Sequence, residues 1–470
     1  MNGKDTGTGK SITAQVADYL AGIRYETLPP EVVVALKRLL LDTLGTCLAG
    51  NTLGVGCREV VDLALTTRGS PESTLLGFGH KVAASMAAFA NGAMSHALNY
   101  DASGADGGHL GVTALAAPFA VAERVGGVSG KDFLCGMAAG TELTARLASA
   151  VAAGKYENPG VLKGQLLGYF GAAASAGRVM KLTSVEMHSA LALALMQAAG
   201  TMQVVFDGDP PAKAIYGAFP NLGGVISTLL SRQGVGAEIN VFDGPAGLFQ
   251  LQYGGNGDPT LLTRKLGDEF LLSKIRFKPW PTSGVLHPFI EAALKLVSSK
   301  HLNVREIREV RIRGGEHFRT FCEPVEERRV PRNAAAAANS AFFAVAKALA
   351  NKKITLGDFT PAGLQQDAVR QIADKMICLI EPALERTAIV EITMVSEERY
   401  TSEISQTQAG SGGGMSYDQL REKFLDCAQY AARPITKETL QEIIQVIENF
   451  EHVPDVSGLA ALLTVAGSQT

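Results

Sequence analysis

Apolar residues recur at helical spacing along most of the chain, and polar, glycine-containing segments separate one apolar run from the next. Ser11 precedes the first run and is expected to cap a helix, because its hydroxyl can accept a bond from a free backbone N–H. Pro29 and Pro30 open a second helix that is expected to reach Gly50. The pattern then predicts helices over residues 82–98, 112–125, 131–153, 165–180, 184–202 and 212–230. This half of the chain is therefore predicted to be a helical bundle.

The pattern changes after about residue 265. Alternation of apolar and polar positions, which is typical of half-buried strands, is found at residues 305–314, 387–396 and 400–406. Helical spacing is found between and after them, at residues 334–350, 367–380, 417–431 and 437–450. We therefore expect a mainly α fold with two domains. Residues 1–265 and 410–470 would form a large all-helical domain, and residues 266–409 a smaller α+β domain.

One loop concentrates polar groups where two apolar helices break. Asp101, Asp106 and His109 lie between glycines, after the helix that ends near Tyr100. Backbone that leaves a helix inside a hydrophobic body must find hydrogen-bond partners in side chains, water or a ligand. The loop is therefore a candidate binding site, and the simpler alternative is that these residues only cap and turn the chain.

Composition narrows the class of protein. The net charge of the 470 residues is −3, and the sequence lacks a basic run, so we expect no nucleic-acid partner. No apolar run is long enough to span a membrane, and the N-terminus lacks the apolar core of a signal peptide. The six cysteines form no CxxC pair, and no cluster has the spacing of metal ligands. We expect a cytoplasmic enzyme without a bound metal or a membrane partner.

Several separated motifs resemble those of one known family. They are His96-Ala97-Leu98-Asn99-Tyr100-Asp101, Gly108-His109-Leu110-Gly111, Gly168-Tyr169-Phe170-Gly171-Ala172-Ala173-Ala174, Pro211-Ala212-Lys213-Ala214-Ile215-Tyr216, Phe277-Lys278-Pro279-Trp280-Pro281 with His287, and the segment 339–346. In this order they resemble the MmgE/PrpD proteins, which include 2-methylcitrate dehydratase, cis-aconitate decarboxylase and iminodisuccinate epimerase. The resemblance implies the two-domain fold, a homodimer, no obligatory cofactor and a small carboxylate as substrate.

The sequence departs from the family pattern at three places. Leu162 stands where dehydratase and decarboxylase members carry a histidine, Ala102 replaces a second acid, and Tyr216 replaces a histidine. Loss of hydroxide needs an acid on the leaving oxygen besides a base for the α-proton. Two candidate proton donors are therefore missing, unless Lys163 takes the vacated place.

The remaining residues still form a set that can transfer protons. His109 would be the proton shuttle, Asp101 would orient it, and the lysines Lys213 and Lys278 would hold carboxylates and stabilise developing negative charge. Further candidates for substrate binding are Tyr216, Tyr169, His96, Lys163 and His287. The simpler alternatives are a turn histidine, solvated lysines and a helix-capping His287.

This set predicts removal of a proton next to a carboxylate in a small di- or tricarboxylate, without a cofactor. Epimerisation of an iminodisuccinate-like substrate is the preferred hypothesis, because it needs an acid and a base but no leaving group. A lyase related to 2-methylcitrate dehydratase or cis-aconitate decarboxylase is the alternative. A catalytically silent carboxylate-binding protein is a third hypothesis, of another class.

Overall fold

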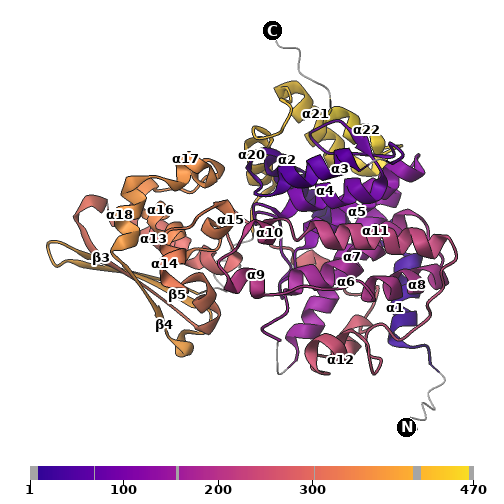
Figure 1. Ribbon diagram of the computed structural model, residues 1–470, viewed down its shortest axis with the longest axis horizontal. Helices are drawn as coiled ribbons and strands as arrows, with labels where there is room; N and C mark the ends of the chain where they lie inside the picture. Colours follow the sequence, from indigo (N-terminus) through magenta and orange to yellow (C-terminus); the bar gives the residue numbers. More distant parts are fainter. Residues whose placement is uncertain (1–8, 68, 155–157, 301, 406–413, 465–470) are drawn as a thin grey trace.

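The computed structural model describes residues 9–67, 69–154, 158–300, 302–405 and 414–464. The chain forms two bodies, each with its own hydrophobic core. The larger body is helical, and the smaller one carries helices and a sheet (Figure 1). This mainly helical architecture with a smaller α+β part confirms the predicted fold class. No helix in the described ranges is both long enough and apolar enough to cross a bilayer.

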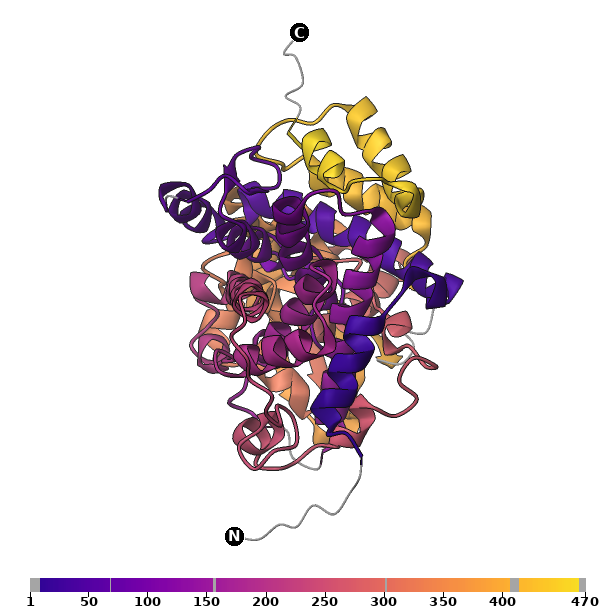
Figure 2. The same ribbon diagram turned by 90° about the vertical axis from the view of Figure 1, so that its right-hand side faces the viewer.

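Helices from both ends of the chain build the larger body. They are α1 (Ile12–Gly22), α2 (Pro30–Leu53), α3 (Cys57–Thr66), α4 (Ala84–His96), α5 (Leu110–Val125), α6 (Gly130–Ala152), α7 (Lys163–Val179), α8 (Ser184–Leu195), α9 (Gln203–Phe206), α10 (Pro211–Ala214), α11 (Ala218–Arg232), α12 (Leu248–Tyr253), α20 (Tyr417–Ala428), α21 (Lys437–Glu448) and α22 (Ser457–Leu462). The three C-terminal helices, yellow in Figure 2, lie against the N-terminal helices, and α20 packs on α2. The Ser11 side chain accepts a bond from Ala14 N at 3.2 Å, so the predicted cap of α1 is confirmed.

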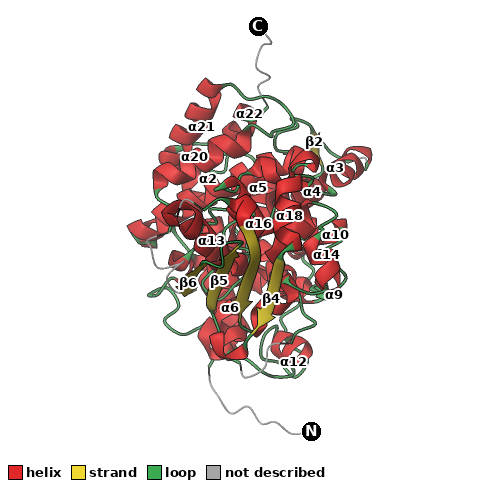
Figure 3. Ribbon diagram, turned by 90° about the vertical axis from the view of Figure 1, so that its left-hand side faces the viewer, coloured by secondary structure: helices red, strands yellow, loops and turns green. Residues whose placement is uncertain are grey.

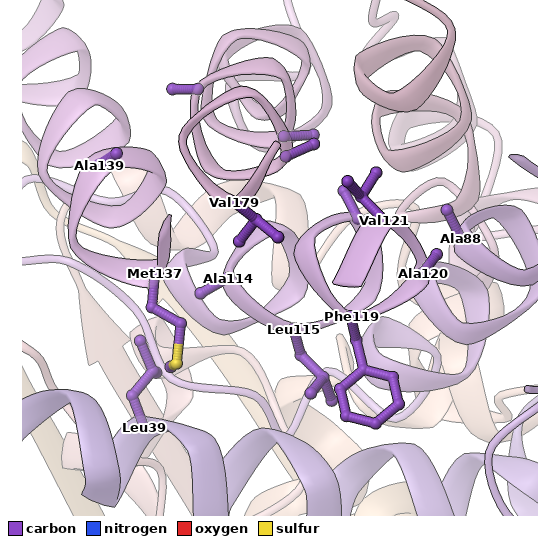
Figure 4. Close-up of a cluster of buried hydrophobic side chains, with 14 of the residues drawn as sticks. Leu39, Ala88, Ala114, Leu115, Phe119, Ala120, Val121, Met137, Ala139 and Val179 are labelled. Atoms are coloured by element: carbon purple, nitrogen blue, oxygen red, sulfur yellow. The ribbon is translucent and has the colours of Figure 1, made fainter. Parts of the chain in front are cut away.

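Small residues let the central helices approach one another closely. A Cβ on Gly140 of α6 would lie 2.5 Å from the carbonyl oxygen of Gly171 on α7, so only glycine fits there. Leu115 and Phe119 of α5 fill the space between α5 and the neighbouring helices (Figure 4). The abundance of alanine and glycine thus produces a densely packed bundle. Because close packing restricts movement of the helices, the bundle is a rigid support for a site.

The smaller body is built on a four-stranded sheet with the order β4-β3-β5-β6 (Figure 3). The strands are β3 (Ile307–Gly314), β4 (Met376–Ile380), β5 (Thr387–Met394) and β6 (Arg399–Ser405), and only β3 and β4 run parallel. The accompanying helices are α13 (His287–Lys300), α14 (Val325–Arg329), α15 (Ala334–Ala337), α16 (Ala341–Asn351), α17 (Pro361–Leu364) and α18 (Asp367–Asp374). α13 packs on β5 and β6, and the apolar side chains of β3 alternate toward this core. The alternation that predicted β3, β5 and β6 is therefore confirmed.

Five expected elements differ clearly from the structure. The helix expected at 184–202 ends at Leu195. The helix expected to stop at Gly50 continues to Leu53. The helix expected at 367–380 ends at Asp374, because the apolar run that follows pairs with β3 as strand β4. The helix expected at 334–350 breaks after Ala337, and the one expected at 212–230 breaks after Ala214. Both of these breaks deliver polar side chains to the candidate site.

The two cores divide the chain into three consecutive stretches. Phe270 and Leu272 pack in the larger core, whereas most buried apolar residues from Leu286 to Ile404 pack in the smaller one. Ala335 is an exception and packs in the larger core. Phe424 and the C-terminal helices return to the larger core. The domain boundaries at residues 265 and 410 themselves stay a prediction.

Candidate active site

A buried carboxylate lies at the centre of the candidate site. Asp101, which has no exposed surface, lies in the loop between α4 and α5. Its Oδ2 lies 2.7 Å from Nδ1 of His109, and its Oδ1 lies 3.1 Å from Nδ1 of His96. His96 is the last residue of α4, and His109 immediately precedes α5. One carboxylate therefore accepts a hydrogen bond from each of two imidazoles.

The loop is held in place by its own backbone. Ser103 and Arg276 exchange two main-chain hydrogen bonds, and Leu110 N donates to Ala102 O. Gly107 and Gly108 have φ values of 92° and 82°, which an L side chain rarely adopts. The glycines predicted to turn the chain thus bring His109 back over Asp101.

The electrostatics of this cluster favour an ionised carboxylate between neutral imidazoles. Burial alone would raise the pKa of Asp101, but His109, His96 and Lys278 together hold it well below its usual range. Desolvation lowers the pKa of His109 below 6.5 and that of His96 to about 3, against the opposing pull of Asp101. Because both Nδ1 atoms donate to Asp101, each Nε2 carries a free lone pair at neutral pH. His109, whose side chain is 22% exposed, is the more accessible base.

The two predicted lysines lie close enough to this cluster to act on the charge of Asp101. Lys213 lies in α10, and its ammonium lies 5.0 Å from the centre of the Tyr216 ring. That ring lies 4.0 Å from the His96 ring, centre to centre. Lys278 donates two bonds of 2.8 Å, to the carbonyl and to the side-chain oxygen of Asn99. Desolvation lowers the pKa of both lysines, that of Lys278 to about 8.

The first turn of α7 closes another side of the site. A Cβ on Gly164 would lie 2.7 Å from the Tyr216 hydroxyl and 2.9 Å from Cδ2 of His109, so α7 begins directly against both rings. Leu162 precedes this turn and is buried, and its side chain offers no proton. Lys163 Nζ donates to Asp106 O at 3.3 Å. Lys163 therefore reaches the loop that carries His109.

Two predicted site residues lie away from the Asp101 cluster. The Tyr169 ring packs against Gly223 on α11. His287 begins α13, and its ring lies 5.4 Å from the ring of Trp280. Burial lowers the pKa of His287 to about 3, so this side chain is neutral. For Tyr169 the structure offers a packing role within its described part. Nε2 of His287 is enclosed and has no hydrogen-bond partner in the described ranges. Substrate binding by the two residues stays a prediction.

The structure adds polar residues that sequence reasoning missed. Asn339 lies in the break between α15 and α16, and donates to Asp209 Oδ1 at 3.3 Å. Its Oδ1 accepts a bond of 3.4 Å from Asn99. Asp209 forms a buried ion pair with Arg328 of α14. The signal for Asn339 is an asparagine followed by a capping serine inside an alanine-rich run, which marks a helix start rather than a helix interior.

His96, Asp101 and His109 also form a group of potential metal ligands in space. Their ligand atoms lie within 4.8 Å of one another, although no spacing in the sequence indicated such a cluster. Both oxygens of Asp101 already accept imidazole N–H groups, and the nearby ammonium groups of Lys278 and Lys213 repel a cation. The donor set therefore suits proton transfer and anion binding better than it suits a divalent metal.

A separate cavity of about 780 Å³ lies at the junction of the two bodies. Its wall is formed by residues 52–55 at the end of α2, by residues 329–334 and by residues 359–361. None of the predicted site residues lines it. The catalytic candidates are instead packed below the surface, where only His109 keeps appreciable exposure.

Comparisons with known proteins agree with the motif resemblance. Residues 14–260 match the MmgE/PrpD N-terminal domain, and residues 280–449 match the MmgE/PrpD C-terminal domain. A cis-aconitate decarboxylase-like protein, oryM, from Aspergillus oryzae is 27% identical over 97% of both chains. Human cis-aconitate decarboxylase is 24% identical over 97% of this chain and 95% of its own. The Aspergillus terreus cis-aconitate decarboxylase is 24% identical over 76% of this chain and 75% of its own.

Proposed function

Because the chain belongs to the MmgE/PrpD family, we propose that it is a lyase that removes carbon dioxide from a small unsaturated tricarboxylate of the cis-aconitate kind. The observation that carries the proposal is the hydrogen bond of 2.7 Å between buried Asp101 and His109, beside two lysines with lowered pKa values. This arrangement couples a proton-transfer group to a binding site for carboxylates. The names of the relatives favour this lyase over the epimerase that the sequence alone suggested.

The reaction needs one proton and no acid on the leaving group. The bond from carbon to the departing carboxylate breaks, and its electron pair forms a new carbon–carbon double bond. The electrons of the former double bond take up a proton at the carbon next to a second carboxylate. Carbon dioxide leaves as a neutral molecule, so the leaving group needs no acid. Leu162 nevertheless replaces a histidine that decarboxylase members carry, so another residue of this chain must deliver the proton to carbon. Leu162 and Ala102 also count against dehydration, in which hydroxide must be protonated as it leaves.

His109 is the group placed to deliver that proton. Its Nδ1–H donates to Asp101, so Nε2 is the atom left to exchange a proton with substrate. The edge of the ring that carries Nε2 faces Gly164 and the Tyr216 hydroxyl. Desolvation keeps His109 neutral in the free protein, but a bound polyanion would favour the imidazolium. The substrate would in this way help to charge its own proton donor.

Buried positive charge around the dyad suits a polyanion. Near Asp101 and Asp209 lie three buried cations, Lys213, Lys278 and Arg328, which leaves one positive charge in excess. The N-terminal ends of α5 and α7 also meet at this point, and neither has a side-chain cap. Free N–H groups at such helix ends favour anions. Together these features support binding of a substrate with several carboxylates.

Epimerisation of an iminodisuccinate-like substrate stays the second candidate. The observation that favours it is the presence of two groups with lowered pKa values, His109 as base and Lys278 as acid, without a further proton donor for a leaving group. Such a reaction would remove a proton on one face of a carbon and return one on the other.

Proton NMR in heavy water tests the proposal directly. The protein is incubated with cis-aconitate, and we expect release of carbon dioxide and a product that carries one deuterium at the carbon next to a carboxylate. The His109→Ala variant should lose this activity, whereas His188→Ala should keep it, because His188 is a buried histidine bonded to Ile239 O away from the site.

Other outcomes would redirect the assignment. Inversion of an iminodisuccinate stereoisomer with loss of its α-proton signal, and no reaction of cis-aconitate, would establish the epimerase instead. Binding of all tested carboxylates without exchange or turnover would identify a silent carboxylate-binding protein. The homodimer that the resemblance implies stays a prediction that light scattering can check.

A further inference from the structure

A buried lysine behind the site connects four separate segments of the chain. Lys423 of α20 lies 2.7 Å from Oδ1 of Asp42 on α2. Its ammonium also donates to Tyr100 O at 2.8 Å and to Lys278 O at 3.1 Å. Both members of the ion pair are buried, with side chains 2% and 0% exposed. Two of the three N–H donors of this ammonium thus bond carbonyl groups on different segments, and the ion pair ties the ammonium to a third segment.

Two of these segments carry the proton-transfer groups. Tyr100 lies between Asn99, which holds the Lys278 ammonium, and Asp101, which holds both imidazoles. The Tyr100 hydroxyl donates to Pro279 O at 3.2 Å, and the Lys423 ammonium lies 3.7 Å from the centre of the Tyr100 ring. The backbone on both sides of the site is therefore fastened to the same ammonium.

Stability alone gives little reason for such a pair. Desolvation raises the pKa of the Asp42 carboxyl, and its oxygens have no hydrogen-bond partner in the described ranges apart from the contact with Lys423. Burying two charges costs free energy that their attraction often only offsets, so well-packed apolar residues would stabilise this position as well. What apolar residues cannot supply is directional bonding to two carbonyl groups at once.

We propose that Lys423 and Asp42 form a positioning pair, which fixes the backbone of residues 99–101 and of Lys278 so that Asp101 and the Lys278 ammonium keep their geometry. Asp42 holds the ammonium of Lys423 in place, and Lys423 holds the two carbonyl groups. Neither side chain contacts the substrate. The catalytic part of this inference rests on the proposed function, whereas the mechanical part does not.

Hydrogen–deuterium exchange followed by mass spectrometry tests the mechanical part without any substrate. In Lys423→Met we expect the peptides that cover residues 97–104 and 276–281 to exchange about tenfold faster, because both lose an anchor. Asp42→Asn should have a smaller effect in the same two peptides. The matched control is Lys347→Met, which removes another buried lysine, paired at 3.0 Å with Asp358 inside the smaller body. It should leave both peptides unchanged.

Turnover tests the catalytic part. With cis-aconitate we expect Lys423→Met to lower kcat about tenfold while KM changes little, and Lys423→Arg, which keeps the charge, to restore part of kcat. Exchange that is unchanged in Lys423→Met, or equal to that in Lys347→Met, would overturn the proposal. Faster exchange with an unchanged kcat would overturn its catalytic part. If the wild-type protein does not turn over any substrate, the proposed function fails, and the exchange result still decides the mechanical claim.

Discussion

Two buried charged clusters of the larger body differ in how completely their hydrogen bonds are used. In the first, Glu142 accepts bonds from Arg146 and from the main-chain N–H groups of Leu271 and Leu272. Arg146 in turn donates to the carbonyl groups of residues 261, 264, 265 and 269. Each charged group is surrounded by partners, so this cluster fixes one loop and leaves no capacity for a ligand.

The Asp101 cluster is different. Nε2 of His109, the ammonium of Lys213 and the hydroxyl of Tyr216 have no hydrogen-bond partner within the part of the chain that the structure describes. Buried polar groups are usually paired, and an unpaired one costs free energy. Groups with spare bonding capacity at one place can bind a ligand, which makes this cluster the candidate site. The two clusters are both charged and buried, and spare bonding capacity is the property that distinguishes the candidate site from the structural ion pair.

Replacing the central carboxylate should give the largest effect on activity. In Asp101→Asn the amide can no longer accept two N–H donors, so His109 is free to adopt the other tautomer. We expect kcat with cis-aconitate to fall by about 10²–10⁴-fold while the fold persists. Initial rates and circular dichroism measure the two quantities.

The control for this variant lies in the same loop. Asp106 is exposed, and its side chain accepts a bond from Ser149. Asp106→Asn should keep full activity. Comparable losses in the two variants would mean that the loop, and not the Asp101 carboxylate, is what the reaction needs.

The sequence predicts this site only in part, for physical reasons. Asp101 and His109 stand out because glycines and charged residues interrupt an apolar pattern. Such a local interruption can be recognised from the sequence alone. Lys278 and Lys213 are found through motif resemblance. His96, in contrast, lies inside a helical run, and only the fold shows that its Nδ1 faces Asp101.

Most features that the sequence does not predict depend on interactions between segments far apart along the chain. Asn99, Asn339 and Asp209 form a chain of hydrogen bonds across the junction, and no local pattern links residues so far apart. The sequence pattern predicts a helix where strand β4 lies, because a short apolar run has no decisive period of its own. Its partner β3 lies more than sixty residues away along the chain, and pairing with β3 decides its conformation.

Disrupting the Glu142–Arg146 cluster, whose hydrogen bonds are all made within the protein, should lower the free energy of unfolding without changing the chemistry. Arg146→Met leaves the Glu142 carboxylate buried without its counter-charge and deprives several carbonyl groups of a donor. Breaking a buried pair in this way costs about 3–5 kcal/mol of unfolding free energy. Urea denaturation measures this loss. The kcat of the folded fraction should stay at the wild-type value, and a fall in kcat would show that the two clusters are coupled.

Removing the Lys213 cation from the Asp101 cluster should instead raise the free energy of unfolding. Desolvation lowers the pKa of Lys213, so burying its ammonium costs free energy in the folded state. In Lys213→Met we expect the unfolding free energy to rise by about 1 kcal/mol. We also expect KM for cis-aconitate to rise about tenfold, because a charged hydrogen bond is lost. Lys131→Met, at a lysine 48% exposed, should change neither quantity, and a stability loss in Lys213→Met would mean that Lys213 is a structural residue.

The smallest change, the pH dependence of kcat/KM, distinguishes the lyase from the epimerase. If the imidazolium of His109 delivers the proton, kcat/KM falls about tenfold per pH unit above its pKa, which desolvation places below 6.5. If neutral His109 is the base and protonated Lys278 the acid, kcat/KM rises through the same pKa and falls again above a pKa of about 8. For the lyase we therefore expect an optimum on the acid side. A flat profile would contradict both mechanisms, because each depends on the titration of His109, the exposed end of the cluster with spare bonding capacity.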